Sequence, residues 1–469
     1  MAIAVRNLTI RIVSARLVDS RLSLKKAYRK STITRRHKSS LQTTQDFKMN
    51  LFVSCLPGLE PLLSAELDSL QIPHSPTAGG ANLRNASHDQ LLQCHLYLGT
   101  ASHVLWQCGR AFEARKFAEL RKKVAKLKWG DWLMKDAHID IRVTCTKSKL
   151  FHTSAVAERV KAAIYESLGR EEEEEEAPEK SNNDLLIDTD KMVRLTVRIV
   201  KDMVVISIDT SSTPLHRRGY RLETAKAPLR EDLAFALLMV SGWQQQYDGR
   251  QDLKFGGLLD PFCGSGTIVI EGASMMAGLP PGRLRPAPLG GTQLFDPLRW
   301  KTLLDDKVRL EPHSDVIICG SDRDAGAVSA AIANAERAGV RELIDFRNAA
   351  LTSNPWFEDP LLAPNYPLVV TNPPFGKRIK GKDSKRDIHP LLPLYQTLGG
   401  RMSKLIEAKP GAAITVLAHD LKLARRMGLP SIHVAFSTHH GGIDVSAMTS
   451  VSGEATRMQK GADLTRVLT

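Results

Sequence analysis

The 469-residue sequence contains no run of 18 consecutive apolar residues, which argues against a membrane-spanning helix. Its six cysteines are scattered and include no Cys-x-x-Cys pair, so neither a disulfide framework nor a metal site is expected. With 42% hydrophobic residues, the chain is predicted to be soluble and globular, with reduced cysteines in its core. Its length exceeds what a single core accommodates and indicates about three domains.

Acidic residues are scarce in residues 1–48, where 12 Lys and Arg accompany only Asp19 and Asp46. This segment therefore carries a net charge of +10 (12 − 2), which leaves +4 (14 − 10) for the rest of the chain. Its arginines alternate with apolar residues, a pattern typical of a mitochondrial or plastid transit peptide. A start at Met49 would give a cytosolic form without this leader. The alternative is a basic disordered arm that helps to bind RNA.

A glycine loop lies in the segment Gly257–Thr267. A short apolar run ends in Asp260, a turn containing Gly264 and Gly266 follows, and a helical pattern begins after it. Strand, glycine loop and helix form the first unit of a doubly wound sheet, in which ligands bind beyond the carboxyl ends of the strands. Glycines allow the backbone to approach such a ligand closely. A tight turn without a ligand would have the same sequence.

A second motif, Asn372-Pro373-Pro374-Phe375, follows the apolar run Leu368–Thr371. Because proline cannot continue a strand ladder, the strand must stop there and the loop is stiff. The motif suits methyl transfer to a planar exocyclic amine, whose lone pair is delocalised and weakly nucleophilic. The Asn372 side-chain oxygen and the Pro373 carbonyl would accept its two protons, and Phe375 would stack on the base. Catalysis would then depend on positioning and electrostatics. A proline turn at a sheet edge is the alternative.

Together the two motifs resemble those of the S-adenosylmethionine-dependent guanine-N2 RNA methyltransferases that carry an N-terminal THUMP domain. The resemblance extends from about Met49 to the C-terminus. It implies an α/β chain with a C-terminal Rossmann-like doubly wound methyltransferase domain, preceded by α+β ferredoxin-like and THUMP domains. The expected boundaries are a leader at 1–48, a ferredoxin-like domain at 49–109, a THUMP domain at 110–212 with an acidic loop at 170–184, and a methyltransferase domain at 213–469.

The resemblance also implies the site residues. The catalytic residues are expected to be Asn372, Pro373, Pro374 and Phe375. The residues expected to bind S-adenosylmethionine are Asp260, Pro261, Cys263, Gly264, Gly266, Thr267, Asp322 and Asn348. Asp322 ends the predicted strand Val316–Asp322, where a carboxylate can accept hydrogen bonds from both ribose hydroxyls. RNA is the expected partner, and neither a membrane, a metal nor a second copy of the chain is expected.

One position departs from the family pattern. Family members usually place an acid shortly after the third strand, where it accepts a hydrogen bond from the adenine amino group, and Ala350 occupies that position here. Asn348 is a candidate substitute through its amide oxygen. The departure raises the alternative of a non-catalytic RNA-binding or assembly protein.

Two basic segments are candidates for RNA contact. The run Leu215–Arg221 joins the two halves of the chain, and Lys377 and Arg378 follow the proline motif. Phosphates and bases would contact the following residues of these segments: His216, Arg217, Arg218, Tyr220, Arg221, Lys377 and Arg378. In the alternative interpretation, the linker arginines pair with acids of the protein. The role of the Pro/Gly/Arg-rich insertion at 279–313 stays open between covering the site and padding the surface.

These observations predict an organellar enzyme that methylates guanine N2 in structured RNA. The linker run most resembles the bacterial large-subunit rRNA branch, so rRNA is the first expected substrate and tRNA the second. Methylation of a protein glutamine is a further alternative, since Asn-Pro-Pro-aromatic serves any planar amide nitrogen.

Overall fold

The computed structural model describes residues 48–170, 189–211, 213–222, 228–243, 255–305, 315–375 and 390–451. The predicted leader except its last residue, all of the predicted acidic loop except its first residue, and the candidate RNA contacts Lys377 and Arg378 lie outside these residues. Within the described residues, no helix is long and apolar enough to cross a bilayer. The six cysteines are all free, and all but Cys145 are buried, as predicted for core thiols.

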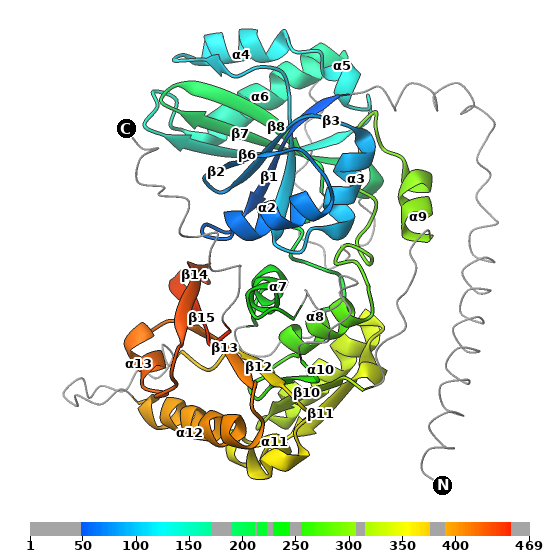
Figure 1. The fold of residues 1–469 in the computed structure, drawn as a ribbon. Helices are drawn as coiled ribbons and strands as arrows, with labels where there is room; N and C mark the ends of the chain where they lie inside the picture. Colours follow the sequence, from blue (N-terminus) through cyan, green and yellow to red (C-terminus); the bar gives the residue numbers. More distant parts are fainter. Residues whose placement is uncertain are drawn as a thin grey trace. The chain divides into compact units, whose positions relative to one another are not determined.

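The first part of the chain folds around one sheet, in the order β2-β3-β1-β4-β8-β7-β6 with β5 beside β8 (Figure 1). Its strands are β1 (Met49–Cys55), β2 (Ser75–Thr77), β3 (Gly80–Ala86), β4 (Ala101–Gln107), β5 (Phe112–Glu113), β6 (His138–Thr146), β7 (Met192–Val200) and β8 (Met203–Asp209). Its helices are α2 (Glu60–Ser69), α3 (His88–Tyr97), α4 (Phe117–Ala125), α5 (Trp129–Trp132) and α6 (Thr153–Leu168). Because β4 pairs with β8, the predicted ferredoxin-like and THUMP segments share a continuous sheet.

The second part folds around a seven-stranded sheet in the order β11-β10-β9-β12-β13-β15-β14. Its strands are β9 (Gly257–Asp260), β10 (Ile317–Asp322), β11 (Ile344–Asn348), β12 (Pro367–Thr371), β13 (Ala413–Ala418), β14 (His433–His440) and β15 (Ile443–Thr449). Strands β9 to β13 are parallel, and β14 and β15 form an antiparallel hairpin beside β13. This confirms the predicted doubly wound sheet. The strand order reverses at β9, between β10 and β12, where such sheets bind their ligands.

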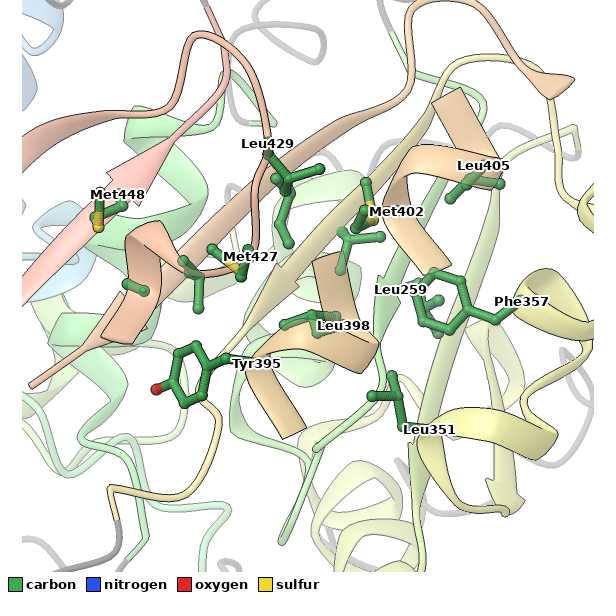
Figure 2. Packing of buried hydrophobic residues seen from close by; sticks show 14 of the residues in the cluster. Leu259, Leu351, Phe357, Tyr395, Leu398, Met402, Leu405, Met427, Leu429 and Met448 are labelled. Atoms are coloured by element: carbon green, nitrogen blue, oxygen red, sulfur yellow. The ribbon is translucent and has the colours of Figure 1, made fainter. Parts of the chain in front are cut away.

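Helices cover both faces of this sheet (Figure 1). They are α7 (Glu231–Val240), α8 (Thr267–Met276), α10 (Ala325–Ala338), α11 (Pro355–Glu358), α12 (Leu392–Ala408) and α13 (Leu421–Arg425). Helix α9 (Pro297–Asp305) lies instead beside the first part of the chain, where Arg299 pairs with Asp89 at 3.0 Å. Neighbouring residues of a strand point to opposite faces. Leu258 accordingly faces Gly272 of α8, whereas Leu259 belongs to the buried cluster that includes Leu398 and Met402 of α12 (Figure 2). Each face of β9 is therefore buried, which places its end firmly between the two helix layers.

The insertion after α8 packs against the first part of the chain. We call residues 279–295 the interdomain strap. The Gly282 N–H donates to the Leu96 carbonyl at 2.8 Å, and the Leu289 N–H donates to the Thr210 carbonyl at 2.8 Å. The buried Arg285 guanidinium donates to the carbonyls of His95 and Leu215, each at 2.5 Å. The strap therefore packs against the first part of the chain, a contact that neither of the two roles considered from the sequence had included.

Candidate functional site

The glycine loop between β9 and α8 contains two glycines in left-handed conformations, with different surroundings. Gly264 has φ +51°, and a Cβ there would meet no atom within 4 Å. Gly266 has φ +84°, and its Cβ would lie 3.0 Å from the Ala331 Cβ of α10. Gly264 therefore faces open space that a ligand can fill, whereas Gly266 permits α8 to pack against α10.

Three hydrogen bonds hold this loop in place. The Cys263 N–H donates to the Ser321 carbonyl at 2.9 Å, and the Gly264 N–H donates to Asp322 Oδ2 at 3.0 Å. The Asn334 side chain of α10 donates to the Ser265 carbonyl at 3.1 Å. Burial raises the pKa of the Cys263 thiol well above its usual range, so this cysteine is a neutral packing residue. Pro261 and Thr267 are also buried at the two ends of the loop.

Asp322 lies at the carboxyl end of β10, where the sequence predicted it. Its Oδ2 accepts from Gly264, and its Oδ1 accepts from the Asp324 N–H at 3.0 Å. These two bonds fix the carboxylate, while each oxygen keeps a lone pair for a further donor. At the end of the neighbouring β11, the Asn348 amide nitrogen donates to the Asp322 carbonyl at 3.0 Å. Asn348 and Ala350 are both exposed, so each can face a bound group.

Asp260 connects the glycine loop to the proline motif. The carboxyl is 1% exposed, and Thr371 Oγ1 donates to its Oδ1 at 2.6 Å. The Phe262 N–H donates to the same oxygen at 3.1 Å. Burial raises the pKa of Asp260 to about 7, against the opposing effect of these two hydrogen bonds. Asp260 therefore positions the strand that carries Asn372, in addition to bordering the predicted cofactor space.

The proline motif follows β12 and contains a buried polar side-chain atom, the Asn372 Oδ1. Within the described residues this oxygen has no hydrogen-bond partner. Pro373 is buried behind it, Pro374 is exposed, and Phe375 is half-buried. A buried amide oxygen without a partner costs free energy of about 1–3 kcal/mol. Such an atom, in a loop that proline makes stiff, is an acceptor suited to a donor on a bound substrate.

His419 was not identified from the sequence. It follows the last residue of β13, the strand beside β12, and its ring centroid lies 6.3 Å from that of Phe375 at an interplanar angle of 53°. Its Nδ1 lies 2.7 Å from the carbonyl oxygen of Asp444, which stands at the start of β15, just after the turn of the β14–β15 hairpin. The usable signal was its place directly after a buried strand, at the edge where doubly wound sheets bind ligands.

Most of the linker run Leu215–Arg221 is buried or half-buried in contacts within the protein, whereas the sequence predicted contacts with RNA. The Arg218 side chain is 1% exposed and lies 3.6 Å from Glu271 of α8, and its guanidinium donates to the Gly99 carbonyl at 2.6 Å. Tyr220 is equally buried, and its hydroxyl donates to Glu271 at 2.9 Å. Arg221 pairs with Glu231 at 2.7 Å. The alternative interpretation, that the linker arginines pair with acids of the protein, therefore describes Arg218 and Arg221, and Tyr220 likewise bonds to an acid of the protein.

The other two candidates of the run behave differently from each other. Burial, assisted by the nearby Arg230 charge, lowers the pKa of His216 to about 4, so the imidazole is neutral near pH 7 and offers no cation to a phosphate. Arg217 is exposed and remains available for phosphate contact. The structure thus brings the cofactor candidates and Asn372 together at one edge of the sheet, and leaves Arg217 as the accessible cation of the linker.

Two family descriptions match parts of the chain. A THUMP domain matches residues 114–209, which cover the later strands of the first sheet. An RMKL-like methyltransferase domain matches residues 218–444, which contain the second sheet up to the start of β15, including the glycine loop and the proline motif.

Individual proteins are also similar. The ribosomal RNA large subunit methyltransferase K/L of Syntrophotalea carbinolica is 30% identical over 408 residues, which are 85% of this chain and 53% of that protein. The chain thus spans about half the length of the curated relatives it matches. A crystal structure described as a possible methylase from Clostridium difficile 630 has 27% identity and a TM-score of 0.68, and covers 86% of this chain and 98% of its own. SMU.472, solved in complex with SAH, shares the fold with a TM-score of 0.69 at 22% identity and the same two coverages.

Proposed function

Because this chain joins a THUMP domain to an RMKL-like methyltransferase domain of the S-adenosylmethionine-dependent class, we propose that it methylates the N2 amino group of a guanine in large-subunit ribosomal RNA. The single observation that carries this proposal is the buried Asn372 Oδ1 at the end of β12, which has no hydrogen-bond partner in the described part of the chain. It is an acceptor without a donor, placed where the sheet binds its ligands.

The chain's own residues would position the base. Asn372 Oδ1 and the Pro373 carbonyl accept the two N–H groups of the amine, which draws its lone pair out of conjugation with the ring. Phe375, half-buried beside them, supplies a face for the base to stack on. The Thr371–Asp260 hydrogen bond holds the start of this loop to the end of β9. Catalysis then rests on orientation, and no protein side chain forms a covalent bond to the substrate.

The residues around the glycine loop fit S-adenosylmethionine. The open space over Gly264 admits a ligand against the backbone, and the Asp322 carboxylate retains lone pairs for two ribose hydroxyls. Asn348 uses its nitrogen for the Asp322 carbonyl, which turns its oxygen toward other donors, such as an adenine amino group. When bound, the cofactor supplies an electrophilic methyl group on a sulfonium.

Ribosomal RNA is the first proposed substrate because the relatives at 30% identity are large-subunit rRNA methyltransferases. The THUMP domain and the exposed Arg217 would contact RNA by its shape and phosphates. Transfer RNA is the alternative substrate. The composition of residues 1–48 supports action in a mitochondrion or plastid, and a fluorescent-protein fusion of the full chain, compared with one starting at Met49, tests that location.

Two measurements test the proposed activity. In calorimetric titration of the full chain, S-adenosylmethionine should bind to the wild type and to Asn372→Ala, and should lose most of its affinity for Asp322→Ala. With RNA from a line lacking the protein, the wild type should form N2-methylguanosine and Asn372→Ala should not. Absence of cofactor binding by the wild type, even with RNA added, would favour a non-catalytic RNA-binding protein. If N2-methylguanosine formed only in tRNA, tRNA would replace rRNA as the proposed substrate.

A further inference from the structure

His419 lies beside the proposed base-stacking residue but takes no part in holding the amine. It follows β13, directly beside the strand that ends in the proline motif. Its ring centroid is 6.3 Å from that of Phe375, and the two rings are inclined by 53°. The inclined rings form two sides of a corner, so a base stacked on Phe375 turns an edge toward His419.

The hydrogen bond at one nitrogen of His419 fixes the character of the other. The Asp444 carbonyl oxygen, 2.7 Å from Nδ1, can only accept, so Nδ1 must carry the proton. In the neutral imidazole, Nε2 is then an acceptor. The Asp444 carbonyl belongs to the backbone at the start of β15, which is paired with β14, and this contact holds the orientation of the ring. Among the described residues, no hydrogen bond to Nε2 is present.

Purine bases differ in whether their ring nitrogen N1 can donate a hydrogen bond to an acceptor such as His419 Nε2. In guanine, N1 lies next to the carbon that bears the N2 amino group, and it carries a hydrogen. In adenine and in 2-aminopurine, N1 has no hydrogen and is itself an acceptor. A neutral imidazole acceptor therefore attracts guanine at this edge and repels the other two bases, because two facing lone pairs leave both groups unpaired.

We propose that His419 is a specificity-determining residue, whose Nε2 accepts the N1–H of a guanine stacked on Phe375. This inference rests on the proposed guanine-N2 activity and adds a residue that selects the base. The Asn372 oxygen and the Pro373 carbonyl recognise an amino group of any planar base, whereas His419 recognises the ring nitrogen beside it.

The test uses two synthetic RNA hairpins that carry either guanine or 2-aminopurine at one unpaired loop position. Both bases offer the same amino group, and only guanine has the N1–H. Wild-type kcat/KM should be about tenfold higher for the guanine hairpin than for the 2-aminopurine hairpin. This factor corresponds to gaining one hydrogen bond with guanine and leaving the imidazole nitrogen unpaired with 2-aminopurine. In His419→Leu the preference should fall toward unity, mainly through KM for the guanine hairpin. In His419→Gln it should largely return, since the amide can donate to Asp444 and accept from N1–H.

Two controls separate the outcomes. Glu407→Gln, an exposed change on α12, should leave the preference unchanged, and S-adenosylhomocysteine binding should match the wild type in every variant. Fluorescence of the 2-aminopurine hairpin gives its affinity without turnover, and this affinity should rise in His419→Leu. An unchanged preference in His419→Leu would overturn the role of His419 and leave the proposed activity standing. Failure of the wild type to methylate either hairpin or RNA from the depleted line would overturn both.

Discussion

Thr371 Oγ1 donates a hydrogen bond of 2.6 Å to Asp260 Oδ1, and this bond joins the carboxyl ends of β12 and β9. One end carries Asn372 and the other opens the glycine loop. Besides the backbone pairing of β9 with β12, this buried pair of side chains therefore links the proposed base site to the proposed cofactor site. A change at either residue should affect both the stability of this edge and the chemistry performed there.

The first prediction concerns the pH dependence of stability. Burial raises the pKa of Asp260 from 3.8 to about 7, so the native protein keeps a proton that the unfolded chain releases. Asp260 therefore lowers the free energy of unfolding progressively as the pH rises from about 4 to about 7. Asp260→Asn removes this effect, so the free energy of unfolding of the variant should rise by about 4 kcal/mol relative to that of the wild type across this pH range. Urea unfolding at several pH values measures the difference.

The matched control for this prediction is Asp305→Asn at an exposed position. Its offset from the wild type should stay constant over the same pH range. Parallel curves for Asp260→Asn and the wild type would show that the Asp260 carboxyl does not carry the proton in the native protein.

The second prediction separates backbone strain from close packing at the glycine loop. Gly266→Ala and Gly339→Ala both place a side chain in the left-handed region, at a cost of roughly 1–2 kcal/mol. Only the first also brings a Cβ within 3.0 Å of Ala331, so it should destabilise more. Adding Ala331→Gly should recover part of the loss in Gly266→Ala and none in Gly339→Ala. Equal costs in both backgrounds would mean that α8 and α10 adjust freely around residue 266.

The third prediction distinguishes the two neighbouring arginines of the linker. Arg218→Met leaves Glu271 buried without its cation and should lower the free energy of unfolding by about 3–5 kcal/mol. Arg217→Met should leave stability nearly unchanged, since this side chain is exposed. If Arg217 contacts a phosphate, its loss should reduce the slope of log affinity against log salt concentration by about 1. Thermal unfolding and RNA titration at several salt concentrations measure both effects.

The fourth prediction restores the acid that this chain lacks after β11. Ala350→Asp should strengthen S-adenosylmethionine binding by about tenfold, because a hydrogen bond to a charged acceptor contributes about 1.5 kcal/mol or more. The control Thr352→Asp adds the same charge at an exposed position two residues later and should change the affinity little. Equal affinities of Ala350→Asp and the wild type in calorimetry would indicate that Asn348 already satisfies the adenine amino group.

Local patterns were sufficient to predict the doubly wound sheet and the ends of its central strands. Short apolar runs, glycines and prolines act within a few residues, so the strand ends at Asp260, Asp322 and Thr371 could be read directly. The candidate cofactor residues follow from the rule that parallel strands present their carboxyl ends at one edge.

The contacts of the linker could not be predicted in the same way. A run with three arginines has the same composition whether it contacts RNA or buried acids. Arg218 finds its partner Glu271 only because α8 returns beside the linker, 53 residues later in the chain (271 − 218). His419 was missed for a similar reason, since its relation to Phe375 depends on the pairing of β13 with β12.

The interdomain strap has a consequence for how this protein can be divided. Arg285 is almost fully buried while it donates to two carbonyls, one in the His95 backbone and one in the linker. A methyltransferase half expressed alone would leave part of this guanidinium's bonding unmet, and the first half alone would expose the carbonyls of Leu96 and Thr210 that the strap now occupies. Neither half can therefore be exchanged on its own without breaking these contacts. A functional chimera with another THUMP protein would have to inherit residues 279–295 together with the sheet that they contact.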